Sequence, residues 1–579
     1  MNRRLFLQSA AAMVAGTALT TACSSGGGGG GTSSKKGAAK AVSALKVRIG
    51  TAADSQGPVT VKGATKGGTV NVIEALDMAH ADPGRVYDSQ SGTLAQLVHR
   101  RLTSYKRVGD ELILVGDLAT DTGTASDGNK TWTYSLKDGV KFSDGTALTS
   151  KHIKYAVERL CDKDITDGPT YLPIWLYGEK FSGATPDDDA IETPDDRTVV
   201  FHLKAPQTDF PFACAFAVTA PVLEEAAKDK DAFDKMSIGT GPYKFVSRTD
   251  TEIVLERNTH WDAGTDPVRA QYPDRFEYTI GTASPQLSQE LANATGDGSA
   301  KMTNITVVDS TYLQRVSTDP ELKARTLSER GITLRYAAVN CRRITDIQVR
   351  KALMTAFPKS GVRGIFGGAA WGDIATDILT PVTLGYTKND VYGLPDAGDP
   401  AAAKAILKKA GKSGQKIVFA YSQTDQWDKA SLIVKKALEK AGFTVVVKPL
   451  DAATYWTQIG ATDNEFDMYV AGWTPDWPTG AGTIPTAFDG RLIFDGSSNY
   501  FMYDNDEVNA EIDRIKNEVT DADEAGRAWS ALDKKIMEDA PLVPWGLEAK
   551  TYLHGEQLGG GYIAMSPTGF QGTHVYVKK

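Results

Sequence analysis

The sequence predicts an α/β protein that carries an additional β-rich part. Between about residues 331 and 545, strand-like runs alternate with amphipathic helical patterns. Between about 104 and 237, β-forming residues cluster between Asp-Gly and Asp-Asp turns. With 579 residues, the chain is too long for one small core. We therefore expect several substructures, with flanking pieces around these two regions.

The first 23 residues, MNRRLFLQSAAAMVAGTALTTAC, predict an export signal. Arg3 and Arg4 precede an apolar stretch from Leu5 to Leu19 that is too short for a confident membrane span. NRRLFLQ resembles a twin-arginine signal, although export by the general secretory route stays open. Cys23 follows in a context similar to a lipoprotein signal, except that Thr20 occupies the position where leucine is usual.

A low-complexity run follows Cys23, and we interpret residues 24–66 as a flexible linker. AVSALKVRIG within it could form a short ordered piece. Order is expected from GGTVNVIEAL onward, and SQSGTLAQLVHRRL predicts a helix. ELILVG, KTWTYSL and RTVVFHL predict strands, and Thr149 or Ser150 should cap a helix over KHIKYAVERL.

The pattern changes after residue 237. GTGPYKFV and EIVLERN predict paired strands, and RFEYTI and SPQLSQELANA predict a strand and a helix. From GITLRYAAVN onward, strands and helices alternate, which predicts βαβ units and a mostly parallel sheet. The segments are DIQVRKALMTAF, DPAAAKAILKKAG, KIVFAY, DKASLIVKKALEKAG, FTVVVKP, AATYWTQIG and FDMYVAG. Helical patterns near 506–519 and 523–539 precede PLVPW and a β-rich tail.

Composition excludes several classes of partner. The net charge is −8, from 64 basic and 72 acidic residues, without a basic stripe, so we expect no nucleic-acid partner. Only seven histidines occur, all scattered, and no CxxC spacing exists, so we expect neither a metal site nor a cofactor. Beyond Cys23 there remain Cys161, Cys214 and Cys341. Cys161 and Cys214 are the candidates for a disulfide, with buried free thiols as the open alternative.

No motif supports catalysis. G-x-S-x-G and H-E-x-x-H are missing, and Asp138 and Asp144 lie in Asp-Gly turns, where Asp binds its own backbone. GVRGIFGGAAWGD at 361–373 lacks the Gly-Lys-Ser/Thr ending of a phosphate loop and predicts a mobile cleft loop. We therefore expect a protein that is not an enzyme, although a secreted hydrolase stays open.

The stretch AGWTPDWPTGAG places one carboxylate, Asp476, between Trp473 and Trp477, without Lys or Arg in the stretch. It follows the predicted strand FDMYVAG, and ligands of α/β proteins bind at the carboxyl ends of such strands. Asp476 is therefore a candidate ligand anchor. The alternative is that Asp476 caps a turn while both indoles belong to the core.

Several segments together resemble one family, the extracellular solute-binding proteins of ABC importers of the oligopeptide, dipeptide and nickel type (family 5). The resemblance covers about residues 67–579, and one departure is Pro358-Lys359 in place of an acidic residue. The matching blocks are WTYSLKDGVKFSDGTALT, GTGPY, RNTHW, IQVRKALMTAF, DPAAAKAILKKAG, EKAGFTVVVKPLD and GWTPDWP.

The resemblance implies a two-lobed periplasmic-binding-protein clamshell (type II, cluster C) with a β-rich domain inserted in the first lobe. Lobe I is expected over 67–103, 238–333 and 546–579, the insert over 104–237 and lobe II over 334–545. The implied partners are a membrane permease with its ATPase. We also expect a monomer that is anchored to the outer face of the cell membrane by a lipid on Cys23.

In relatives that bind peptides, the acid that matches Asp476 pairs with the α-amino group of the peptide. The flanking indoles would add stacking and exclude water. Trp473 and Trp477 are therefore ligand candidates together with Asp476. Further cleft candidates, for which ordinary packing is an equal alternative, are Tyr87, Ser89, Trp371 and Trp427. Rival interpretations are another solute, such as an oligosaccharide or a metal chelate, and a receptor without a transport role.

Overall fold

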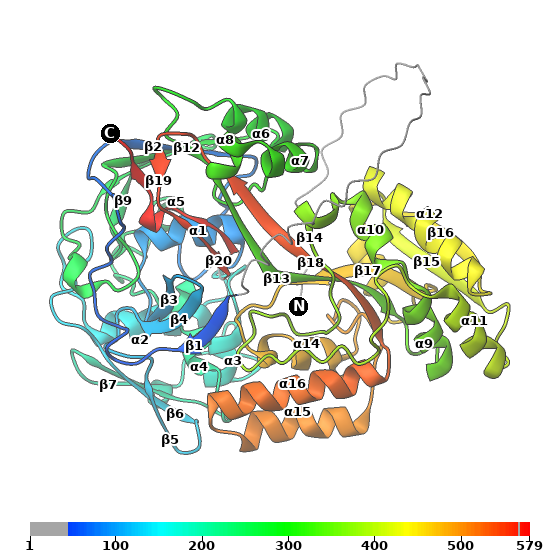
Figure 1. Ribbon diagram of the computed structural model, residues 1–579. Helices are drawn as coiled ribbons and strands as arrows, with labels where there is room; N and C mark the ends of the chain where they lie inside the picture. The colour runs from blue at the N-terminus through cyan, green and yellow to red at the C-terminus, as the bar shows by residue number, and fades with distance from the viewer. Residues whose placement is uncertain (1–44, 566–567) are drawn as a thin grey trace.

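The computed structural model describes residues 45–565 and 568–579, so the predicted export signal and Cys23 lie outside the described residues. Figure 1 shows two bodies joined by a pair of long strands. Blue, cyan and green segments with the red C-terminal strands form one body, and yellow and orange segments form most of the other.

The first body is built on a five-stranded mixed sheet. Strand β2 pairs in parallel with β11 and β12, whereas β9, β10 and β11 pair antiparallel. Val70 and Val72 on β2 are completely buried, as the alternation of a half-covered strand requires. In sheet order, the strands are β12 (Lys301–Met302), β2 (Thr69–Glu74), β11 (Arg275–Ile280), β10 (Glu252–Arg257) and β9 (Tyr243–Arg248).

Two smaller sheets lie beside it. The predicted strands ELILVG, KTWTYSL and RTVVFHL are confirmed as β4, β6 and β8. One sheet contains β1 (Lys46–Ile49), β4 (Glu111–Gly116) and β3 (Thr103–Val108). The other contains β5 (Thr124–Ser126), β6 (Thr131–Ser135), β8 (Thr198–His202) and β7 (Ile191–Asp195).

Part of the segment 24–66, predicted as a linker, is ordered: the short ordered piece expected within AVSALKVRIG is strand β1. Strand β1 pairs in parallel with β4, from Lys46 opposite Glu111 to Ile49 opposite Leu114. Leu45 is buried, and Val47 and Ile49 pack on the same core. This short alternation of apolar residues belongs to the folded body.

The second body is built on a six-stranded sheet, which is mixed and not mostly parallel as predicted. Only β15, β16 and β17 pair in parallel, whereas β13, β14 and β18 are joined by antiparallel pairs. The strands are β14 (Gly372–Asp373), β18 (Leu542–Leu553), β13 (Thr326–Val339), β17 (Met468–Trp473), β15 (Lys416–Ser422) and β16 (Thr444–Leu450). The reason is topological: the chain enters and leaves this sheet along neighbouring strands.

Strands β13 and β18 connect the two bodies, and Figure 1 shows them crossing the centre of the molecule. Their register shifts between Glu329 and Thr333 and again between Arg335 and Tyr336. Gly331 lies in the first bulge with φ +81°, a conformation that favours glycine. The connection therefore contains two local irregularities instead of a continuous ladder.

Helices cover the sheets largely where the periodicity predicts them. Thr149 begins α2 with a capping box to His152. The helix predicted over SQSGTLAQLVHRRL ends early at Val98, because the chain turns extended at His99 and Arg100 then binds Asp117.

In the first body the helices are α1 (Ser89–Val98), α2 (Ser150–Glu158), α3 (Tyr171–Tyr177), α4 (Phe210–Ala213), α5 (Lys230–Lys235), α6 (Ser284–Ala292), α7 (Ser310–Thr318) and α8 (Pro320–Ala324). In the second they are α9 (Ile347–Ala356), α10 (Lys359–Ile365), α11 (Pro400–Lys409), α12 (Asp425–Lys440), α13 (Tyr455–Ile459), α14 (Ile484–Phe488), α15 (Asp506–Glu518) and α16 (Ala522–Glu538). The C-terminal tail adds two hairpin-like pairs, β19 (Leu558–Gly559) with β22 (Tyr576–Val577) and β20 (Tyr562–Met565) with β21 (Thr568–Gln571).

The possible disulfide between Cys161 and Cys214 does not form, since both residues are free and buried. The Cys214 sulfur instead accepts a hydrogen bond from the Tyr134 hydroxyl at 3.7 Å, inside the core of the first body. Burial raises the pKa of Cys161 to about 11, so this thiol stays protonated at neutral pH. In the described part of the chain, no helix combines the length and the apolar character that a membrane crossing requires.

Candidate functional site

Asp476 lies three residues beyond the end of β17 and is held by two tyrosines from the first body. The Tyr87 hydroxyl donates to Oδ1 at 3.0 Å and to Oδ2 at 3.1 Å. The Tyr171 hydroxyl, from the first turn of α3, also donates to Oδ2. These contacts place a carboxylate of the second body against residues more than 300 positions earlier in the chain.

The two phenols orient the carboxylate. Burial, followed by the neighbouring Asp476 charge, raises the pKa of Tyr171 well above that of a free tyrosine. Its hydroxyl therefore keeps its proton at neutral pH and acts as a donor. Because phenols donate hydrogen bonds, they fix the direction of the Asp476 carboxylate.

The loop that carries Tyr87 is itself fixed by buried ion pairs. Arg159 donates to both oxygens of Asp82, at 2.6 and 2.8 Å, in a bidentate pair. The His80 Nδ1 lies 2.8 Å from Asp234, and this carboxylate raises the pKa of His80. The loop is therefore held at two points before Tyr87.

Trp477 is a packing residue at the contact between the two bodies. It is only 3% exposed, and its ring lies 4.7 Å from that of Tyr171, 6.2 Å from Trp175 and 6.3 Å from Phe216. Its Nε1 donates to Asp209 Oδ2 at 2.7 Å. Of the two alternatives, core packing therefore describes this indole.

Trp473 and Ser89 have less specific surroundings. Trp473 is partly buried at the end of β17, and its Nε1 donates to the Gly482 carbonyl at 3.3 Å and to Thr483 Oγ1 at 3.2 Å. Ser89 is the first residue of α1 and is partly buried. The same helix is capped by the Asp88 side chain, which accepts from the Ser91 N–H at 2.7 Å.

Trp371 and Trp427 belong to a different aromatic cluster, within the second body. Trp371 stacks on Trp545 at 4.9 Å, and Trp427 meets Trp545 edge-on at 5.8 Å. Phe366 contacts all three rings. The structure thus brings together Asp476, Tyr87 and Trp477, but groups Trp371 and Trp427 elsewhere.

Four residues near Asp476 and Trp477 were not predicted from the sequence: Tyr171, Trp175, Asp209 and Phe216. Tyr171 and Trp175 are one helical turn apart in YLPIWLY, so an aromatic pair on one helix face was a usable signal. Asp209 and Phe216 carried no such signal, because only the tertiary fold brings them to Trp477.

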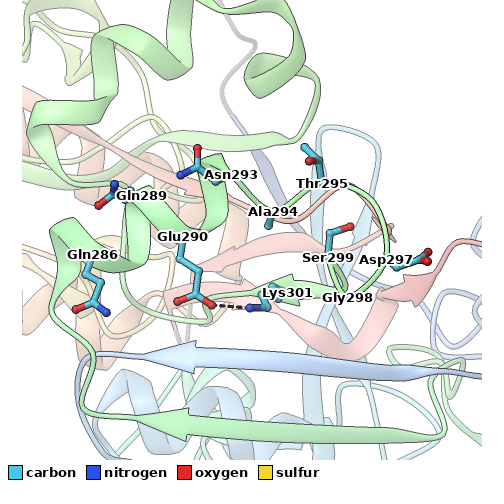
Figure 2. A pocket seen from close by; sticks show the side chains of 10 residues that line it. All are labelled: Gln286, Gln289, Glu290, Asn293, Ala294, Thr295, Asp297, Gly298, Ser299 and Lys301. Atoms are coloured by element: carbon cyan, nitrogen blue, oxygen red, sulfur yellow. Dashed lines mark hydrogen bonds and ion pairs between the residues drawn. The ribbon is translucent and has the colours of Figure 1, made fainter.

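One hollow of about 470 Å³ lies away from these residues, on the first body. Figure 2 shows it between α6 and the chain that leads into β12, with polar side chains around it. Lys301 Nζ donates to Glu290 Oε1 across its wall at 2.6 Å. The ten lining residues include Gln286, Gln289, Asn293 and Asp297, and none of them was a predicted site residue.

The geometry at Asp476 suits the binding of a cation. A fixed carboxylate with aromatic rings nearby favours an ammonium group over an anion. Among the described residues, no group of three or more His, Cys, Asp or Glu side chains is arranged to hold a metal ion.

The model for the middle part of bacterial extracellular solute-binding proteins, family 5, matches residues 114–492, which is more than half of the chain. The chain belongs to this family. The family resemblance deduced from the sequence blocks is thereby confirmed, and the chain is an extracytoplasmic solute-binding protein.

Named relatives agree with this assignment. The probable D,D-dipeptide-binding periplasmic protein DdpA of Escherichia coli is 25% identical over 81% of this chain and 86% of its own. The oligopeptide-binding protein OppA of Bacillus subtilis is 22% identical over 90% and 94%. These relatives are named as binding proteins and not as enzymes.

Among solved structures, clavulanic acid biosynthesis oligopeptide binding protein 2 has a TM-score of 0.79 and 29% identity, over 89% of this chain and 96% of that one. This similarity confirms the two-lobed binding-protein fold that the sequence blocks imply. Strands β13 and β18 are then the connection between the two lobes.

Proposed function

We propose that this family 5 protein captures peptides between its two lobes and delivers them to an ABC importer in the membrane. The observation that carries the proposal is the Asp476 carboxylate, which Tyr87 and Tyr171 hold from the other body. The relatives named as dipeptide- and oligopeptide-binding proteins support peptides as the solute. Binding without chemistry is sufficient for this role.

In this proposal, Asp476 pairs with the α-amino group of the peptide. An ammonium that lobe closure removes from water needs a fixed carboxylate, because an unpaired buried charge is costly. Trp473 would border the same space, whereas Ser89, Trp371 and Trp427 are secondary candidates. The lobe boundaries proposed are 67–103, 238–333 and 546–579 for lobe I, 104–237 for its insert and 334–545 for lobe II.

The mature protein is proposed to be a monomer, tethered to the outer face of the membrane by a lipid on Cys23 after export through the twin-arginine route. The sequence context of Arg3, Arg4 and Cys23 supports this. Metabolic labelling with a radioactive fatty acid should label the wild type and not Cys23→Ala. Equal labelling of both proteins would overturn the lipid anchor.

The test of the peptide role is calorimetric titration with a peptide library in free-amine and N-acetylated forms. We expect Asp476→Asn to lower the affinity for free-amine peptides about 30-fold or more, since truncating one partner of a buried charge pair has effects of this size. The affinity for N-acetylated peptides should fall much less.

The matched control is Asp463→Asn, an exposed aspartate in the turn before β17. It should bind both peptide forms as the wild type does. Equal losses for both forms in Asp476→Asn would remove the role assigned to Asp476. Stabilisation of the wild type by oligosaccharides or metal chelates alone would overturn the peptide assignment.

A further inference from the structure

A cluster of charged side chains lies buried in the first body, between α1 and the chain after η4 (Ala263–Thr265). Arg100 Nε donates to Asp117 Oδ1 at 2.9 Å, and Arg269 Nη1 lies 2.8 Å from Asp117 Oδ2. Arg269 also lies 3.3 Å from Asp266. Lys137 Nζ donates to the backbone carbonyl of Asp117 at 2.8 Å.

Positive charges outnumber negative ones in this cluster. Four basic side chains face two carboxylates, which leaves an excess of two positive charges at neutral pH. The six residues are Arg100, Arg101, Arg269, Lys137, Asp117 and Asp266. Burial lowers the pKa of Lys137 to about 8, so this ammonium stays mostly charged at pH 7.

Arg101 is the unusual member. It is 1% exposed, yet no described residue accepts a hydrogen bond from its guanidinium. Only its backbone N–H binds Asp117, at 3.1 Å. Burial lowers the pKa of Arg101 to about 9, so the side chain is still positively charged at pH 7. A buried cation without an acceptor is rare, because its desolvation is not offset.

The nearby carboxylates are already engaged. Asp117 and Asp266 are used by Arg100 and Arg269. Glu329 on β13 pairs with Arg107 at 2.9 Å. Asp209 is near enough to Tyr105 to raise its pKa, but its Oδ2 accepts a hydrogen bond from Trp477 Nε1 at 2.7 Å. None of these acids is within ion-pair distance of Arg101.

Two tyrosines lie in the neighbourhood of the same guanidinium. Tyr105 and Tyr562 both act electrostatically on Arg101, and the buried Tyr105 hydroxyl has no hydrogen-bond partner. Tyr105 is on β3 and Tyr562 on β20, which packs on the connecting strand β13.

We propose that Arg101 is the anchor of a buried binding site for an oxyanion, a carboxylate or phosphate group, where β3, β20 and β13 meet. A planar guanidinium can hold two oxygens of such a group, and the unpartnered Tyr105 hydroxyl can donate to it. The excess of positive charge in the cluster favours an anion over water. The oxyanion comes either from solution or from the captured solute, and the second source rests on the proposed function.

The first arm of the test uses acetate and inorganic phosphate. Either is titrated into the full-length protein at constant pH and ionic strength, with chloride as the balance, while the melting temperature is followed. The wild type should become more stable as the probe increases, because a ligand that binds only the folded state shifts unfolding. Arg101→Met should lose this dependence.

Arg107→Met is the matched control, because this arginine is on β3, the strand that begins two residues after Arg101, but has a carboxylate partner. It should keep the dependence on acetate or phosphate. If Arg101→Met does not fold, Arg101→Lys tests the same site, since it keeps the charge but loses the bidentate geometry. It should show a weaker dependence than the wild type.

The second arm compares a peptide that has a free C-terminal carboxylate with the same peptide amidated. If Arg101→Met binds the free-carboxylate peptide about tenfold or more weakly than the wild type does, and binds the amidated peptide unchanged, the captured solute is the source of the oxyanion. If the wild type binds no peptide, the proposed function fails while the acetate and phosphate arm still decides this proposal. A wild type insensitive to both probes, with unchanged peptide selectivity in Arg101→Met, overturns it.

Discussion

Two carboxylates, Asp476 and Asp209, take part in the contact between the first body and the short segment after β17. Asp476 is part of that segment, is partly buried and accepts from Tyr87 and Tyr171 of the first body. Asp209 belongs to the first body, is buried and accepts from Trp477 and Thr479 of the segment. Both carboxylates thus accept hydrogen bonds across the contact between the two bodies, and only Asp476 is proposed here as a ligand anchor. They differ in exposure, because Asp476 is partly buried and Asp209 is buried.

Replacing Trp477 should have the largest effect on the contact between the two bodies. Trp477→Ala should lower the free energy of unfolding by about 3–5 kcal/mol, since a buried aromatic ring is replaced by a cavity. Chemical denaturation monitored by circular dichroism measures this. Trp473→Ala, at a partly buried indole of the same segment, is the control and should cost less. Equal costs would show that Trp477 is not the specific contact.

Asp209 should show its buried state in the pH dependence of stability. Burial raises the pKa of Asp209, so the folded state holds its proton more tightly than the unfolded chain does. The free energy of unfolding should therefore fall as pH rises from about 4 through the raised pKa of Asp209.

Asp209→Asn should remove that part of the slope in denaturation curves, because the amide oxygen can still accept from Trp477 and Thr479 but does not titrate. Asp209→Ala should cost about 1–3 kcal/mol, because it leaves two buried donors without an acceptor. An unchanged pH slope in Asp209→Asn would contradict the assignment of Asp209 as a titrating buried acid.

The smallest expected effect is on the Asp476 side. Tyr87→Phe removes one donor from the carboxylate and should lower stability by about 1 kcal/mol or less. It should also lower the affinity for free-amine peptides a few-fold, as measured by calorimetry, because the carboxylate is less well oriented. Tyr272→Phe, which removes a hydroxyl bound to the Val61 N–H, is a control for the loss of a phenol elsewhere. If both variants bind peptide equally well, Tyr87 does not position Asp476.

The sequence predicted most of the elements but not how distant ones meet. Strand and helix segments such as KHIKYAVERL followed from periodicity and capping, which are local properties. The antiparallel order of β13, β17 and β18 did not, because strand pairing between residues 334 and 547 is set by the path of the whole chain. Arg100 leaves the predicted helix for the same reason: its partner Asp117 is identified only in three dimensions.

Some residues of the candidate site were likewise predicted from the sequence, and others were found only in the structure. Asp476 was predicted from its position after a strand between two indoles, and the structure adds its two phenol partners. Tyr171 comes from a helix in the region predicted as β-rich, and Asp209 from a short helical turn beside it. Nothing local to AGWTPDWPTGAG could name these residues. The same limit applies to Arg101, whose missing partner is visible only after every nearby acid has been assigned.

The place of Trp477 in the core has a consequence for how the molecule unfolds. Its side chain lies in the same hydrophobic cluster as Val70 and Leu94 of the first body, together with Val382 and Leu384 of the second. Melting of either body exposes apolar surface of the other, so their stabilities are thermodynamically coupled. The chain should therefore denature as one cooperative unit in calorimetry, and damage to one half should spread to the other.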